Sequence, residues 1–102
     1  MKEFDPKELN RLIHTPVRLT IMTILNYVDE ASFNYLKEKS KVTDGNLSSH
    51  IGKLEESGYI KTRKEFIDKK PHTSYRITAK GQKAFRKYIE QLESILKGIG
   101  EK

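Results

Sequence analysis

The chain has 102 residues, 35% of them hydrophobic, with no cysteine and a formal net charge of +6. This length fits one compact domain, and the lack of cysteine excludes disulfides, thiolate metal sites and cysteine nucleophiles. No apolar run approaches the ~20 residues of a membrane span, and the N-terminus lacks a signal-peptide core, so we expect a cytoplasmic protein without a membrane partner. Residues 1–58 carry a net charge of −1 and residues 59–102 one of +7. The positive charge of residues 59–102 is typical either of a surface that binds a polyanion or of a solvated surface that keeps the protein soluble.

The first elements in chain order are two helices. Pro6 opens a short helix expected over about 6–13. Thr15 and Pro16 then read as an N-cap followed by proline at the first helical position of a second helix. Its apolar residues recur at helical spacing, which predicts the central core helix: Val17, Ile21, Ile24, Leu25 and Val28.

A helix-turn-helix pattern follows. After a short strand, Ser32 caps a third helix, and Thr43 caps a fourth helix over 44–57. One apolar stripe marks the buried side of the fourth helix: Leu47, Ile51 and Leu54. Gly58, followed by an apolar Tyr59, predicts a Schellman-type end for this helix.

The apolar period then changes to two, which indicates a β-hairpin. Strands are expected over 59–67 and 73–77, with a polar and basic tip over 68–72. Thr78 caps a last helix over about 79–97. Its apolar stripe is broad for a terminal helix, which predicts burial against both the domain and a second subunit.

These elements predict a mainly α fold with a small β hairpin (α+β). The order is helix, helix, short strand, helix, helix, strand, strand, helix, a single winged helix-turn-helix domain over 1–102. A helix fits the major groove of B-DNA, where base edges are distinguishable. We therefore expect a sequence-specific regulator of transcription that binds double-stranded DNA. Its recognition helix (44–57) would lie in the major groove and its basic wing (66–73) on the minor groove or backbone.

Two sets of side chains are candidate DNA contacts. Those of the recognition helix are its cap and exposed polar residues: Thr43, Asp44, Asn46, Ser48, Ser49, His50 and Lys53. Those of the hairpin are basic or imidazole side chains: Arg63, Lys64, Lys69, Lys70, His72 and Arg76. The same residues also suit the solvated face of an amphipathic helix and charges that protect a sheet edge from aggregation.

Three segments resemble a known family. They are HTPVRLTIMTIL, TDGNLSSHIGKLEESGYI and KPHTSYRITAKGQKAF. Together they resemble small single-domain winged-helix regulators related to the MarR and ArsR families, over roughly residues 8–90. The resemblance implies a transcriptional regulator that binds duplex DNA as a dimer through its terminal helices. Metal sensors of the ArsR type use cysteine-rich or histidine-rich sites, and this chain has no cysteine.

The terminal helices supply the candidate homodimer interface. Its apolar residues are Leu9, Leu12, Ile13, Phe85, Tyr88, Ile89, Leu92, Ile95 and Leu96.

No enzymatic, metal or cofactor site is expected. His14, His50 and His72 fall on separate elements, whereas a metal needs converging ligands. Adjacent carboxylates such as Glu55 and Glu56 do not face one another on a helix, so they do not form an acid–base pair. A winged helix used as a protein–protein interaction module, without DNA binding, is the alternative function.

Overall fold

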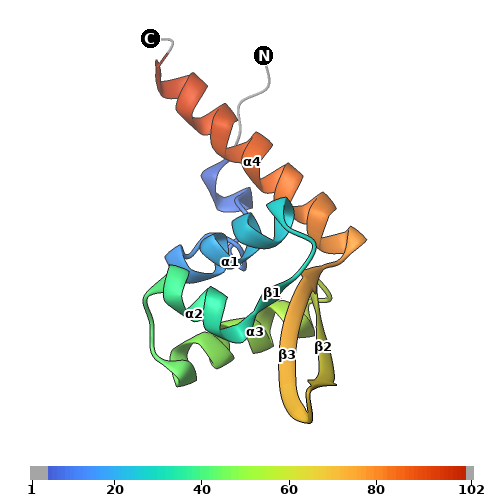
Figure 1. Cartoon of the computed structure of the whole chain (residues 1–102). Helices are drawn as coiled ribbons and strands as arrows, with labels where there is room; N and C mark the ends of the chain where they lie inside the picture. Colours follow the sequence, from blue (N-terminus) through green and yellow to red (C-terminus); the bar gives the residue numbers. More distant parts are fainter. Residues whose placement is uncertain (1–4, 101–102) are drawn as a thin grey trace.

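The structure is a computed structural model that describes residues 5–100. Along these residues lie a 3-10 helix, η1 (Pro6–Glu8), four α-helices and three strands. The α-helices are α1 (Pro16–Tyr27), α2 (Phe33–Ser40), α3 (Asp44–Glu56) and α4 (Ala79–Gly100), and the strands are β1 (Ala31–Ser32), β2 (Ile60–Ile67) and β3 (Lys70–Ile77). Figure 1 shows α1, α2 and α3 as a helical body, with the β2–β3 hairpin beside it and α4 leading away. The expected winged helix-turn-helix order is confirmed.

The helices begin at capping residues that the sequence predicts. In each case a side-chain hydroxyl accepts a hydrogen bond from a backbone N–H of the first turn, which has no partner inside the helix. The capping residues of α1 to α4 are Thr15, Ser32, Thr43 and Thr78. The four helix starts are therefore encoded locally.

The recognition helix α3 ends in the expected Schellman motif. Gly58 takes a left-handed φ of 80°, and its N–H donates to the carbonyl of Glu55 at 2.9 Å. The N–H of Tyr59 donates to the carbonyl of Leu54 at 3.0 Å. The chain reverses sharply at this glycine, and β2 begins immediately afterwards.

The strands form one antiparallel sheet in the order β1-β3-β2. β2 and β3 pair along their whole lengths, up to Ile67 opposite Lys70. Asp68 and Lys69 form the turn, with left-handed φ values of 51° and 66°. This is the pattern of a type I′ turn, which closes a hairpin with two residues. The expected tip over 68–72 is therefore too long, and β3 starts three residues earlier than expected.

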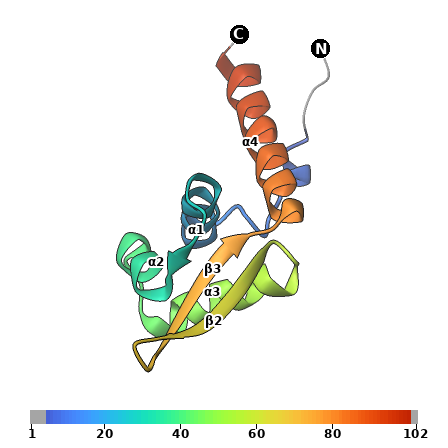
Figure 2. The ribbon, with the colours of Figure 1, turned by 45° about the vertical axis from the view of Figure 1, so that its right-hand side comes forward.

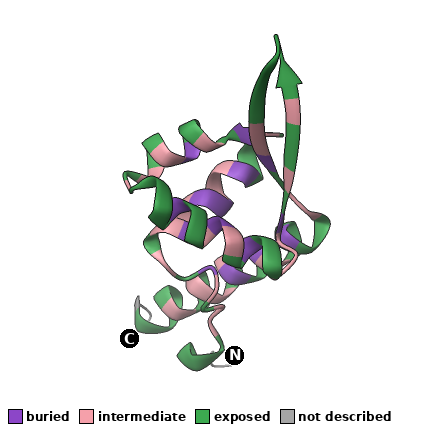
Figure 3. Cartoon of the chain, turned by 90° about the horizontal axis from the view of Figure 1, so that it is seen from below, coloured by how far each residue is buried: buried purple, intermediate pink, exposed green. Residues whose placement is uncertain are grey.

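The core lies where α1, α2 and α3 face one another, as Figure 3 shows by the clustering of buried positions. The expected stripe of α3 is buried: Leu47 and Leu54 are 0% exposed and Ile51 is 3% exposed. Burying one such side chain contributes roughly 1.5–3 kcal/mol. The stripe thus fixes which side of α3 faces outward.

The N-terminal segment differs from the expected helix over 6–13. The structure has only the 3-10 helix Pro6–Glu8, followed by an extended Leu9. The side-chain oxygen of Asn10 accepts from the backbone N–H groups of Leu12 and Ile13, at 3.0 and 3.2 Å. Asparagine competes in this way with helical hydrogen bonds, so the segment turns instead of continuing as a helix.

Helix α4 has two unlike halves. Its first half packs on the domain and buries Phe85 and Tyr88, Leu92 still contacts the core, and the turns that follow extend away from the rest (Figure 2). There, Leu96 is 63% and Ile99 is 69% exposed.

The burial of α4 and of the N-terminal segment changes the expected dimer interface. Phe85, Tyr88 and Ile13 are 7%, 1% and 0% exposed within the single chain. They belong to the core of the domain. The apolar stripe of α4 is wide enough to pack on this core with one side and to leave its other residues available for a second subunit. The other six residues of the set are partly or fully exposed: Leu9, Leu12, Ile89, Leu92, Ile95 and Leu96.

Candidate nucleic-acid interface

The outward face of α3 is polar. Asn46, Ser48, Ser49 and Lys53 are exposed on the side opposite the buried stripe. Their side chains can donate or accept hydrogen bonds, as base edges and phosphates require.

The first turn of α3 uses two of the predicted contacts for its own structure. The hydroxyl of Thr43 accepts from the N–H of Asn46 at 3.2 Å, so it caps the helix. Asp44 forms an ion pair of 2.6 Å with Lys37 of α2. Its negative charge also suits the positive end of the helix dipole. Thr43 is therefore occupied in capping α3 and Asp44 in an exposed ion pair with α2, so both are poorly suited to meet a phosphate.

His50 lies half-buried on α3, and its ring meets a buried arginine that the sequence reasoning missed. Nδ1 of His50 lies 2.7 Å from a terminal guanidinium nitrogen of Arg18. Arg18 is 8% exposed, and its Nε donates to the carbonyl of Leu12. An arginine stays protonated and can only donate, so Nδ1 of His50 is the acceptor and Nε2 carries the hydrogen.

The surroundings of His50 keep its ring neutral. Burial lowers the pKa of His50 below its ordinary value of 6.5, and the positive charges of Arg18 and Lys53 lower it further. A neutral ring with a fixed tautomer presents one N–H donor, at Nε2, on the α3 surface. The one sequence signal for this pair is the position of Arg18, which shares a buried stripe with Ile21, Met22 and Leu25.

A groove separates α3 from the hairpin. It has a volume of about 460 Å³ and is lined by Ser48, Ile51, Glu55, Thr62, Lys64, Thr73 and Tyr75. The hydroxyl of Thr62 donates to the carboxylate of Glu55, which joins the two walls. Burial, together with the charge of Glu55, raises the pKa of Tyr75, so its hydroxyl stays protonated. The groove therefore has a polar lining with one cation, Lys64, on the hairpin side.

The hairpin divides its predicted contacts between two faces, because alternate residues of a strand point to opposite sides. Lys64 lies on the face toward α3. Arg63 points to the opposite face, where it pairs with Glu30 at 3.4 Å and with Glu65 at 3.1 Å. His72 lies opposite Glu65 in the ladder and shares that face.

Four of the predicted lysine contacts on α3 and the hairpin are exposed. These residues, Lys53, Lys64, Lys69 and Lys70, take part in no ion pair within residues 5–100. Exposed cations without partners attract a polyanion, and salt screens this attraction.

A family model described as a winged helix DNA-binding domain matches residues 17–96. The chain belongs to the winged helix DNA-binding domain family. The match covers the helical body, the hairpin and most of α4.

Relatives of this winged-helix domain are similar over most of its length. The uncharacterized protein MJ0432 of Methanocaldococcus jannaschii is 40% identical over 89 residues, which are 87% of this chain and 97% of that protein. A solved transcriptional regulator homologue from Pyrococcus horikoshii OT3 is 34% identical, with a TM-score of 0.84, over 91% of this chain and 94% of that one. A MarR family regulator from Silicibacter pomeroyi shares the fold, with 19% identity and a TM-score of 0.66 over 86% of this chain and 58% of that one. The resemblance to small single-domain winged-helix proteins is confirmed, and the fold is shared with the MarR family regulator.

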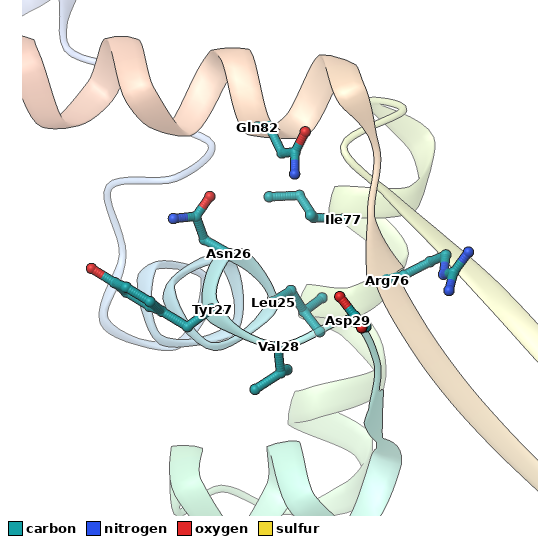
Figure 4. Close-up of a pocket in the computed structure, with 8 residues that line it drawn as sticks. All are labelled: Leu25, Asn26, Tyr27, Val28, Asp29, Arg76, Ile77 and Gln82. Carbon is teal, nitrogen blue, oxygen red and sulfur yellow. The ribbon is translucent and has the colours of Figure 1, made fainter.

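A second pocket of this winged-helix domain lies at the base of the hairpin, away from the groove. It measures about 310 Å³ and is lined by the end of α1, the end of β3 and the start of α4. Figure 4 shows Gln82 pointing from α4 toward Asn26, while Tyr27 points outward and is 80% exposed. Across residues 5–100, no group of acidic, histidine or cysteine side chains could hold a metal ion. In the same residues, no helix is long and apolar enough to cross a bilayer.

Proposed function

We propose that the chain is a sequence-specific regulator of transcription that binds double-stranded DNA as a homodimer. In this proposal, the recognition helix (44–57) occupies the major groove, and the hairpin segment 66–73 lies on the minor groove or backbone. The observation that carries the proposal is the outward polar face of α3 beside a hairpin with unpaired lysines.

The polar face of α3 suits base recognition. The amide of Asn46 can pair with adenine in two hydrogen bonds, and the hydroxyls of Ser48 and Ser49 can meet either donors or acceptors. His50, held neutral beside Arg18, offers one N–H donor, which matches an acceptor such as guanine O6 or N7.

The lysines suit the phosphate backbone. With α3 in the major groove, Lys64 at the groove between α3 and the hairpin and Lys53 on the outward side of α3 are each available to a phosphate. We assign Asp44 and Arg63 to positioning, because each is already engaged in an ion pair.

A salt titration with one charge removed tests this arrangement. Lys53→Ala is expected to weaken duplex binding and to reduce the slope of log affinity against log salt by about one unit. The matched control is Lys97→Ala near the exposed end of α4, which removes the same charge and is expected to leave the slope unchanged. Selection of bound duplexes from a random pool would define the DNA sequence that the chain prefers. An affinity that salt does not alter would contradict the proposal.

The homodimer would form through the C-terminal half of α4. Leu92, Ile95, Leu96 and Ile99 present an apolar stripe that the single chain leaves partly or largely uncovered. A second copy covers it by two-fold symmetry, because the same stripe faces itself. The two recognition helices of such a dimer need a separation of ~34–36 Å to reach successive turns of one duplex face. Light scattering tests it: Leu96→Glu is expected to give a monomer, and a monomeric mass for the unaltered chain at high micromolar concentration would contradict the dimer.

A further inference from the structure

The tip of the hairpin carries an apolar pair that the lysines do not explain. Phe66 is 78% exposed, and Pro71, its partner across the ladder, is also exposed. An aromatic side chain at the end of a hairpin, beyond the domain core, contributes little to folding. Burying this side chain in a complex would gain roughly 1.5–3 kcal/mol relative to leaving it in water.

The register of the hairpin places this pair on the side that faces α3. Residues directly opposite each other in an antiparallel ladder point to the same face, and so do residues two apart along a strand. Phe66 and Pro71 therefore continue the row in which Lys64 and Thr73 line the groove. Ile67, the next residue along, points to the opposite face.

The surroundings of the pair are cationic and stiff. Lys64 lies two residues before Phe66 on the same face, and Lys69 and Lys70 follow in and after the turn. The two-residue turn and the unbroken ladder restrict the backbone of the tip, so Phe66 loses less conformational freedom on entering a complex than it would in an open loop. An apolar residue framed by lysines suits a polyanion that also has an apolar interior, and duplex DNA has stacked bases behind its phosphates.

We propose that Phe66, supported by Pro71, is a minor-groove wedge of the wing. This inference rests on the proposed DNA-binding function and specifies what the tip does there. Phe66 packs against the sugar edges and one base step of the minor groove, while Lys64 on the same face and Lys69 in the turn neutralise the flanking phosphates. Lys70, opposite Ile67, points to the other face of the hairpin. Apolar wedges of this kind partly unstack a step and bend the duplex toward the major groove. Pyrimidine–purine steps unstack most readily, so the wing selects such a step without hydrogen bonds to its bases.

The test compares Phe66→Ala with Ile67→Ala, a matched loss of an exposed apolar side chain on the other face of the same hairpin. The probe is the duplex selected by the unaltered chain, with 2-aminopurine at the step under the wing and a fluorophore pair at its ends. The unaltered chain and Ile67→Ala are expected to raise the 2-aminopurine emission and bend the duplex. Phe66→Ala is expected to do neither and to bind about tenfold more weakly. Its salt slope is expected to stay unchanged, because no charge is lost.

The outcomes separate the two proposals. Equal bending, emission and affinity for Phe66→Ala and the unaltered chain would overturn the wedge and leave DNA binding in place. Failure of the unaltered chain to bind any duplex would overturn both proposals. Sedimentation with vesicles of anionic lipid that depends on Phe66, with duplex binding that does not, would overturn the wedge in favour of a lipid surface. Matched melting temperatures for the two variants confirm that the fold is intact, since both side chains are largely exposed.

Discussion

The recognition helix and the wing lie side by side, yet different interactions hold them in place. Helix α3 is fixed by three buried side chains, by a cap at its start and by a Schellman motif at its end. The outer half of the hairpin has only its own backbone ladder and turn, and the residues there are mostly exposed. Helix α3 can therefore present side chains at set positions, as base recognition requires, whereas the hairpin extends charged side chains and an exposed aromatic residue away from the core.

Helix α3 and the hairpin also meet at a joint that includes the start of α4. The N–H of Thr78 donates to the carbonyl of Tyr59 at 2.9 Å, and the Thr78 hydroxyl lies 2.6 Å from the carbonyl of Gly58. One turn into α4, a Cβ at Gly81 would lie 2.1 Å from the same Tyr59 carbonyl oxygen. The end of α3, the start of β2 and the start of α4 are therefore locked together.

Breaking this joint has the largest expected effect. Gly81→Ala is expected to lower the free energy of unfolding by about 1–3 kcal/mol, because the methyl group forces α4 away from the Tyr59 carbonyl. This loss outweighs the usual preference of a helix for alanine over glycine, which is about 1 kcal/mol. Chemical denaturation measures the change.

The matched control is Gly98→Ala in the same helix. A Cβ at Gly98 has no described neighbour within 4 Å. Here the helix preference acts alone, so we expect a gain of about 0.5–1 kcal/mol. A gain at Gly81 as well would contradict the close packing of the joint.

An expected effect of similar size tests how α3 is anchored to α1. Arg18→Met keeps the length of the side chain but removes the donors to the Leu12 carbonyl and to Nδ1 of His50. Leaving such groups without partners lowers stability by about 1–3 kcal/mol. Loss of the positive charge also raises the pKa of His50, although burial continues to lower it. Denaturation and an NMR titration of the His50 ring measure the two changes, and an unmoved titration would contradict the contact.

The same histidine gives stability a pH dependence. The folded chain holds the pKa of His50 below its ordinary value of 6.5, which applies in the unfolded chain. As the pH falls through 6.5, the unfolded chain takes up this proton before the folded chain does, so stability decreases until the folded pKa is passed. Above pH 6.5 His50 is neutral in both the folded and the unfolded chain, so its full contribution to stability is present. His50→Gln, which can still accept from Arg18, is expected to lose this part of the pH dependence.

The smallest expected effect concerns the wing. Lys69 occupies the left-handed region with a φ of 66°, where a residue with a Cβ is disfavoured by roughly 1–2 kcal/mol. Lys69→Gly gives an Asp-Gly pair, which type I′ turns prefer, and is expected to stabilise the hairpin by about 1 kcal/mol. The same change is expected to reduce the salt slope of DNA binding by about one unit if the lysine meets a phosphate. Lys69→Asn, which tolerates the left-handed region, controls for the charge alone.

The sequence predicts those features that depend on neighbours in the chain. Caps such as Thr43, the stripe led by Leu47 and the reversal at Gly58 each involve residues within one or two turns, so spacing and residue type determine them. The polar face of α3 follows directly, because it is what remains once the stripe is buried.

Other features depend on packing between distant segments. Arg18 meets His50 across 32 positions of sequence, and only the angle between α1 and α3 brings them together. The need for glycine at position 81 arises from the Tyr59 carbonyl of another element. The expected helix over 6–13 is wrong because the Asn10 side chain accepts the hydrogen bonds of the Leu12 and Ile13 N–H groups in place of backbone carbonyls. The spacing of apolar residues carries no information about this competition.

The close packing of Gly81 against the Tyr59 carbonyl bears on how far apart the two recognition helices of the proposed dimer would lie. Helix α4 leaves the domain at an angle set by direct contact with the end of α3, and the whole molecule extends 59 Å along its longest axis. In the proposed dimer, joined near the far end of α4, a small change in the tilt of this helix at its start would be amplified along its length and would displace the partner's α3. In the proposed dimer, the spacing of the two half-sites on DNA would therefore depend on a contact that lies in neither the DNA interface nor the dimer interface.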